Sequence, residues 1–433
     1  MSQTFASLKL FNYRLWFVAA LVANVGTWMQ RVAQDWLVLT DLSHSSGVAV
    51  GVVTALQFGP ALLLSPWAGV VADRVDNRRL LIATQGAMGV LALGLGGLVL
   101  SGQARLWHVY IFATLLGVVA AFDGPARQTF VAQMVPHTIL PNAVALNSAS
   151  FNAARLIGPG LAGLLIAAVG SGWVFLINGA SFAATIAAMM LMRRGELRVM
   201  PRVAKGKGQL RAGVAYVRGR TDILVIMVVM GVVSALGLNF QLTSALMATT
   251  VFGKGAGEYG VLGSILAIGS LAGALMAARR RRPRVRLVIG SAFGFGVASG
   301  TMALMPSYLT FALVSITVGF ASLTMLTAAN ATIQMSTDPL FRGRVMALYM
   351  MVLQGTTPIG APFVGWVGET FGARWSIGLG AIASVVVALA ALVWTKRHWK
   401  FELRYRVRAR PHVEVSYLGR PQVEQDAAVT AAA

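Results

Sequence analysis

The sequence predicts an all-α membrane protein with twelve transmembrane helices in two six-helix halves. Three observations support this fold class: a shortage of charge, a recurrence of long apolar runs and an internal repeat. Of the 433 residues, 57% are hydrophobic and 12% are charged, whereas soluble domains are about a quarter charged. A soluble protein of this length would need more polar residues than this to cover the surfaces of its domains, so we expect the apolar residues to face lipid.

Apolar runs of membrane-spanning length recur along almost the whole chain. A transmembrane helix needs about 20 mostly apolar residues. In the first half, the expected spans are 15–38, 46–71, 79–100, 107–126, 142–169 and 173–192. In the second half, the expected spans are 222–248, 257–278, 286–305, 308–331, 345–367 and 374–395. The two halves are therefore residues 1–192 and 222–395.

The distribution of Lys and Arg predicts the orientation, because these residues are retained on the cytoplasmic side. Most of them lie in segments on the same side as both termini, above all in a basic linker, 193–221, and a basic tail, 396–433. On the other side, the loops carry Arg105, Lys254 and Arg374. We therefore expect both termini in the cytoplasm. The net charge of +22 arises from these same basic segments. The clustered Lys and Arg residues do not form the motifs of a nucleic-acid-binding module, so no nucleic acid is expected as a partner.

The two halves also resemble each other in sequence. A shift of 202 residues aligns ALNSASFNAARLIGPGLAG, which starts at Ala145, with ALYMMVLQGTTPIGAPFVG, which starts at Ala347. Parallel six-helix repeats are the design of one large class of secondary transporter. In that class, the substrate site lies at the interface of the repeats near the middle of the membrane.

The loop after the second expected span carries the most specific motif. From Gly69 to Arg79 it reads GVVADRVDNRR. Gly69 permits close approach of a neighbouring helix, and Asp73 can pair with Arg74 or Arg78. The loop resembles the signature of the major facilitator superfamily, and the resemblance implies that Asp73 helps to hold the cytoplasmic side closed. The alternative is a basic loop that only fixes the topology, since Arg74, Arg78 and Arg79 satisfy the positive-inside rule.

Of the charged side chains within or next to the expected spans, five are candidates for a functional role. Insertion of a charged side chain at the centre of a membrane helix costs about 2.5–3.5 kcal/mol, so such a residue is first interpreted as part of a functional site. Arg31 and Asp35 are four residues apart, as are Asp123 and Arg127, so each pair can share one helix face. Arg155 lies midway along its span and needs a carboxylate, a carbonyl or an anionic substrate as a partner. We expect all five on a proton or substrate pathway, with purely structural ion pairs as the alternative.

Helix-bending residues follow in the fourth and fifth expected spans. Pro125 is expected to bend or end its helix. Gly158, Pro159 and Gly163 resemble the antiporter motif of exporters in the superfamily, and ordinary helix packing is the alternative. Together with Asp123 and its neighbours, this stretch resembles the exporter branch that contains the enterobactin exporter, the transmembrane secretion effector family.

Further polar residues of the spans are candidates for a substrate pocket. They are Gln30, Gln34, Asn147, Asn152, Asn239, Gln241, Asn330, Gln334 and Gln354. The chain has no Cys and five His, and no nucleotide, hydrolase or metal-ligand motif, so we expect neither an enzyme nor a cofactor or metal.

These features predict a secondary transporter in a bacterial plasma membrane, surrounded by lipid and working as a monomer. The expected activity is export of small amphipathic molecules, of the drug or siderophore type, by proton antiport with alternating access. Many drug exporters of the superfamily carry an Arg where Ala113 stands, so Arg31 or Arg155 would have to serve instead. An importer or facilitator of a small solute, or a non-transporting membrane protein, are the alternatives.

Overall fold

The chain folds almost entirely into helices. The computed structural model describes residues 3–198, 209–278, 284–399, 401–405 and 413–417. Its α-helices are α1 (Phe11–Leu37), α2 (Gly47–Arg74), α3 (Asn77–Leu100), α4 (Leu106–Met134), α5 (Leu140–Val169), α6 (Ser171–Leu191), α7 (Gln209–Gly219), α8 (Thr221–Leu236), α9 (Phe240–Leu246), α10 (Ala256–Ala278), α11 (Val285–Ala303), α12 (Tyr308–Ser336), α13 (Pro339–Gly355), α14 (Thr357–Phe371) and α15 (Ala373–Trp399). Two short strands, β1 (Phe401–Tyr405) and β2 (Val413–Tyr417), pair antiparallel after the last helix.

Ten segments of the described residues are long and apolar enough to cross a membrane. They are α2 to α6, the stretch Thr221–Val251 that contains α8 and α9, α10, α11, α12 and α15. Large apolar side chains such as Val90, Leu304 and Ile359 are exposed on the outside of the helices, where lipid would cover them. The all-helical membrane fold is therefore confirmed, whereas the count of twelve spans is not.

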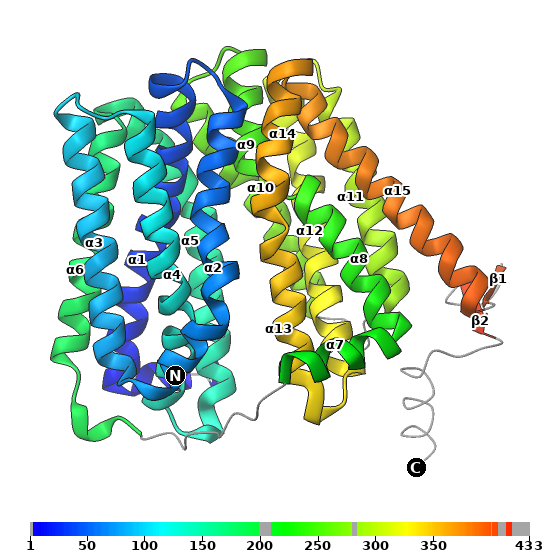
Figure 1. The fold of residues 1–433 in the computed structure, drawn as a ribbon, viewed down its shortest axis with the longest axis horizontal. Helices are drawn as coiled ribbons and strands as arrows, with labels where there is room; N and C mark the ends of the chain where they lie inside the picture. The colour runs from blue at the N-terminus through cyan, green and yellow to red at the C-terminus, as the bar shows by residue number, and fades with distance from the viewer. Residues whose placement is uncertain (1–2, 199–208, 279–283, 400, 406–412, 418–433) are drawn as a thin grey trace.

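Two groups of helices stand next to each other (Figure 1). Helices α1 to α6 lie on the left of the view, and α7 to α15 lie on the right. The packing repeats between the groups: α2 packs on α4 as α10 does on α12, and α3 packs on α6 as α11 does on α15. Likewise α1 contacts α5 and α6, and α8 contacts α14 and α15.

Glycines join the two groups at the end that carries the loop between α1 and α2. A Cβ on Gly47 would lie 2.6 Å from the carbonyl oxygen of Gly365, so α2 and α14 touch backbone to backbone. In the same way, a Cβ on Gly163 would lie 2.6 Å from the carbonyl oxygen of Ala256, where α5 meets α10. Near this end, Glu369 of α14 also accepts hydrogen bonds from the Ser46 hydroxyl (2.8 Å) and a backbone amide of α2. Toward the opposite end, where N marks the amino terminus, the groups diverge (Figure 1).

Two of the expected spans are interrupted. The stretch predicted as one helix over 222–248 breaks after Leu236, and Asn239 has the non-helical dihedrals φ −94° and ψ 43° before α9 begins. The span predicted over 345–367 is divided between α13 and α14, with the boundary at Gly355 and Thr356. Glycine in a helix interior favours such breaks, and irregular backbone is tolerated at membrane depth where it lines a cavity.

Two further expectations differ from the structure. Pro125 is expected from the sequence to bend or end its helix; α4 does not end there but continues to Met134, beyond the expected span 107–126, and membrane helices tolerate a proline in their interior. The linker 193–221 is not only a loop: α7 forms its last part and packs on α13, where Tyr216 stacks on Phe341 at 4.7 Å between ring centroids. Residues 199–208 of the linker and most of the tail 396–433 lie outside the described residues.

Candidate functional site

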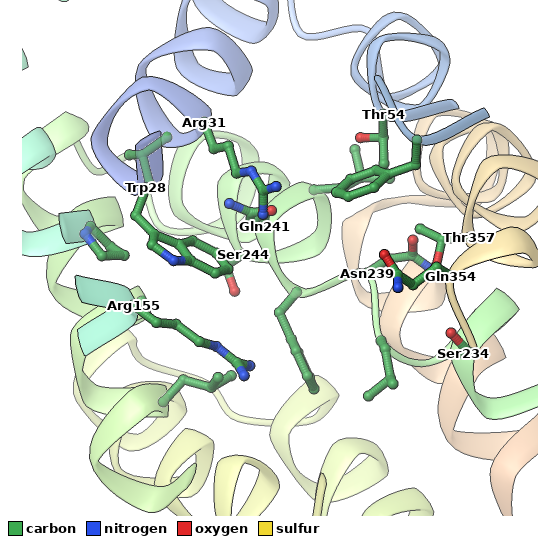
Figure 2. A pocket seen from close by; sticks show the side chains of 18 of the residues that line it. Trp28, Arg31, Thr54, Arg155, Ser234, Asn239, Gln241, Ser244, Gln354 and Thr357 are labelled. Atoms are coloured by element: carbon green, nitrogen blue, oxygen red, sulfur yellow. The ribbon is translucent and has the colours of Figure 1, made fainter. Parts of the chain in front are cut away.

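A cavity of about 290 Å³ lies between the two groups of helices. Figure 2 shows its lining side chains, which come from α1, α2 and α5 on one wall and from the second group on the other. The second wall contains the two helix interruptions described above. A site with both groups in its walls changes shape whenever the groups move relative to each other.

The neutral wall of the cavity is built by the two helix interruptions. Asn239 lies at the break between α8 and α9, and its amide donates to the Ala235 carbonyl at 2.8 Å, which uses an acceptor freed by the break. Gln354 and Thr357 lie on either side of the boundary between α13 and α14, and both line the cavity. The Ser234 hydroxyl donates to the Leu353 carbonyl and links the two interruptions. The polar groups of this wall are therefore uncharged.

The opposite wall carries two guanidinium groups around one indole ring. The guanidinium carbon of Arg31 on α1 lies 4.8 Å from the centroid of the Trp28 ring. That of Arg155 on α5 lies 5.8 Å from the same centroid. Arg31 also lies 5.1 Å from the ring centroid of Phe58 on α2. Cation–π contacts hold a guanidinium in place but supply no hydrogen-bond acceptor.

Charge in this region is not neutralised by direct contacts. Among the described residues, no acidic side chain lines the cavity. Asp35 is buried one turn beyond Arg31, and it forms no ion pair with Arg31 or Arg155 in the described part of the chain. The predicted spacing thus brings Asp35 near Arg31 without a salt bridge. The buried Nε of Arg31 and Nε2 of Gln241 lack hydrogen-bond partners within the described residues.

Asp123 and Arg127 form a separate polar cluster within the first group. Arg127 pairs with the Asp123 carboxylate at 2.9 Å, and both side chains are largely buried. The carboxylate also accepts hydrogen bonds from Thr84 (2.9 Å) and Gln85 (2.7 Å) of α3. Arg127 reaches Asn24 of α1 at 3.4 Å. The cluster ties α1, α3 and α4 together, and its residues do not line the central cavity.

The predicted gate motif lies at the junction of α2 and α3. Arg78 is buried and donates its Nε to the Met189 carbonyl of α6 at 2.9 Å. Asp76 caps α3 by accepting from the amide of Arg78 at 2.9 Å, and its carboxylate lies 3.8 Å from the exposed Arg79. Arg74 ends α2 and is exposed. The side-chain surroundings of Gly69 and Asp73 lie outside the described part, so the proposed latch contact of Asp73 stays a prediction.

The Gly-Pro segment of α5 lies where three helices meet. A Cβ on Gly158 would lie 2.6 Å from the Cβ of Trp28, so α1 packs closely at the cavity. Pro159 lines the cavity, and its carbonyl oxygen touches Gly260 of α10. With Gly163 against Ala256, this segment forms the seam between α5 and the second group. A close seam therefore borders the cavity directly.

The predicted pocket residues divide between the cavity and other places. Asn239, Gln241 and Gln354 line the cavity. Gln30 is buried and bonded to Asn178, and Gln34 is buried in α1. Asn147, Asn152, Asn330 and Gln334 lie elsewhere, with Asn152 bonded to Ser148 and Gln334 to Asn330.

Sequence reasoning missed the aromatic side chains of the cavity. Trp28, Phe58 and Tyr259 line it together with the residues predicted above. A signal existed for Trp28, because it precedes Arg31 by three residues and so shares its helix face. No comparable signal pointed to Phe58 or Tyr259, because aromatic residues occur throughout membrane helices.

Comparison with known proteins confirms the resemblance found in the motifs. The chain matches the family of transmembrane secretion effectors over residues 2–416. The staphyloferrin A transporter of Staphylococcus aureus is 24% identical and covers 87% of this chain and 94% of its own length. The multidrug efflux pump Tap of Mycolicibacterium fortuitum is 26% identical over 82% of this chain and 88% of its own. The enterobactin exporter EntS of Salmonella paratyphi A is 22% identical over 88% and 91%.

The fold is also that of solved transporters. A bacterial homologue of the human lysosomal transporter Spinster, in an inward-facing and occupied conformation, superposes with a TM-score of 0.68 at 14% sequence identity. The alignment covers 88% of this chain and 96% of that protein. Family and fold thus indicate a transporter, and the apolar helices make it an integral protein of a bacterial inner membrane.

Proposed function

Because the chain belongs to the transmembrane secretion effector family of the major facilitator superfamily, we propose that it exports small amphipathic molecules by secondary active transport. The observation that carries this proposal is the cavity between the two groups of helices, with helix interruptions in its wall. Interrupted helices beside a central cavity are typical of substrate sites in secondary transporters. The similarity to a multidrug efflux pump and to an enterobactin exporter supports the outward direction.

The proposed mechanism is alternating access between two halves. The repeated packing of α1 to α6 and α8 to α15 supports twelve spans in two pseudo-symmetric halves, with α8 and α9 forming one interrupted span and α13 and α14 another. The glycines of the internal repeat support it as well: Gly158 lets α5 approach α1, and its counterpart Gly360 lets α14 approach α8. In the proposed orientation, with both termini in the cytoplasm, the side joined by the close contacts of Gly47 and Gly163 is the outer side.

Proton antiport is the proposed energy source. Asp35 is the buried acid nearest the cavity, one turn from Arg31. Loading of a proton on Asp35 would change the charge beside Arg31 and so the affinity for a substrate at the cavity wall. Asp123 is a second acid within the helices, but its pairing with Arg127 ties it to the first group.

A transport assay in proteoliposomes tests the proposal. The full chain is reconstituted, and movement of a fluorescent panel (fluorescein, rhodamine 123 and ethidium) is followed with and without an imposed pH gradient. We expect gradient-driven movement of at least one dye that is lost in Asp35→Asn. Downhill movement that ignores the gradient and is unchanged in Asp35→Asn would contradict antiport and establish the facilitator. If no dye and no labelled siderophore moves, with or without the imposed pH gradient, the result would contradict transport itself.

A further inference from the structure

The two arginines of the cavity lack the partners that other buried arginines of the protein have. Arg127 pairs with Asp123 at 2.9 Å, and Arg220 pairs with Asp222 at 2.8 Å. Arg31 and Arg155 form no ion pair in the described part of the chain. An unpaired charge inside a membrane protein is costly to keep, so its retention at a cavity wall calls for a functional reason.

The donors at this wall point at empty space within the protein. Figure 2 shows Arg31 and Arg155 extending from either side of Trp28 toward the centre of the cavity. The Nε atom of Arg31 has no acceptor among the described residues but is covered by protein atoms, so the terminal nitrogens of the two guanidinium groups are the donors that a bound molecule can reach (Figure 2). Buried donors are almost always paired in native proteins. Acceptor atoms are therefore the complement that this wall needs.

Net charge in this region stays positive. Asp35 is the nearest acid, and one carboxylate cannot offset two guanidinium groups. The other polar side chains of the cavity, including Asn239, Gln354 and Ser244, are neutral. A cationic molecule would therefore meet repulsion, whereas an anion would gain two charge-assisted contacts.

We propose that the transported molecule carries an anionic group, a carboxylate or a comparable acid, held by Arg31 and Arg155, with a flat apolar or aromatic body against Trp28. This inference rests on the proposed function and names its substrate class. The neutral wall around Asn239 and Gln354 then contacts the hydrogen-bonding groups on the far side of the molecule. Aromatic rings at Trp28 and Phe58 give the apolar body its surface.

Binding of three matched probes to the full chain in detergent tests the inference. The probes are 2-naphthoate, 2-naphthamide and 2-naphthylmethylammonium, which share a ring system and differ in charge. Affinity is measured from the ligand-induced rise of the unfolding temperature. We expect naphthoate to bind most tightly and the ammonium probe most weakly. Equal or tighter binding of the ammonium probe would overturn the inference.

Variants locate the anion. In Arg155→Gln and Arg31→Gln, the Kd for naphthoate should rise roughly tenfold to a hundredfold, since hydrogen bonds to charged groups have about that value. Arg155→Lys should recover part of the loss. Arg218→Gln, which removes an exposed arginine of α7 away from the cavity, is the matched control and should change nothing. An unchanged Kd in both cavity variants would overturn the inference, and if these variants do not fold, the three-probe ranking in the unmodified protein decides.

The outcomes separate this inference from the proposed function. Naphthoate binding that depends on Arg155, without gradient-driven movement of any dye, would sustain the anion site and contradict export. Gradient-driven export of rhodamine 123 with no preference for naphthoate would sustain export and contradict the anion site.

Discussion

Removal of the Asp123 carboxylate should destabilise the first group of helices more than removal of any of its neutral partners. Asp123 is held by Arg127 at 2.9 Å and by hydrogen bonds from Thr84 and Gln85. Breaking a buried ion pair by deleting one partner costs about 3–5 kcal/mol, because the other charge stays buried and unpaired. A single hydrogen bond between membrane helices contributes about 0.6 kcal/mol on average.

The structure places the expected value at the lower end of that range. The Arg127 side chain is 19% exposed and the Asp123 side chain 7%, so Arg127 can recover some solvation. We therefore expect Asp123→Ala to lower the free energy of unfolding by about 3 kcal/mol, and Thr84→Val by about 0.6 kcal/mol. Gln85→Leu should cost no more than Thr84→Val, because the Gln85 Oε1 atom has no hydrogen-bond partner among the described residues.

The assay is reversible unfolding in mixed micelles with a double-mutant cycle over Asp123→Ala and Arg127→Ala. The double variant should cost less than the sum of the single variants, because it leaves no unpaired charge. The reasoning is refuted if the two single effects add without coupling, or if Asp123→Ala costs no more than Thr84→Val.

Three further predictions concern transport. Gly163→Leu should abolish most transport, because a Cβ there lies 2.6 Å from a backbone oxygen of α10. Gly97→Leu is the control and should transport normally, because the space around its Cβ is open. Equal flux in the two variants would contradict a functional role of the close contact between α5 and α10. Glu369→Gln should shift the population toward the outward-open state by about twofold to tenfold. The shift is measured as the labelling of a single introduced cysteine at Ala361, which is buried where α14 meets α2. Unchanged labelling would contradict the proposed outer closure at the Glu369 contact. Asp35→Asn should remove the dependence of dye flux on the pH gradient while downhill flux persists, and a retained dependence would exclude Asp35 as the coupling acid.

The sequence predicted the all-helical membrane fold, because helices that cross a membrane are recognised by their length and apolar composition. It did not predict the interruption between α8 and α9, since Gly237 and Asn239 lie within a continuous apolar run and such residues are common in membrane helices. These interruptions place Asn239 and Gln354 at the cavity. The polar residues Asn330 and Gln334 carried the same signal and lie elsewhere.

Local spacing likewise predicted ion pairs only in part. Asp123 and Arg127 are four residues apart and pair directly, whereas Arg31 and Asp35 have the same spacing and do not. The difference lies in the rings around Arg31, because its guanidinium lies beside Trp28 of the same helix and Phe58 of α2. Phe58 comes from another helix, and its approach cannot be read from one helix alone.

The most direct test of alternating access is a pair of distances measured by double electron–electron resonance in lipid nanodiscs. The chain contains no cysteine, so introduced labels are unique. One pair, Asp41→Cys with Phe371→Cys, spans the side that we propose to be the outer one. The other pair, Ala149→Cys with Gly343→Cys, joins exposed positions of α5 and α13. Changing the pH, or adding 2-naphthoate, should lengthen the outer distance while the other shortens. Distances that stay fixed under every condition, or that lengthen together, would contradict transport by alternating access.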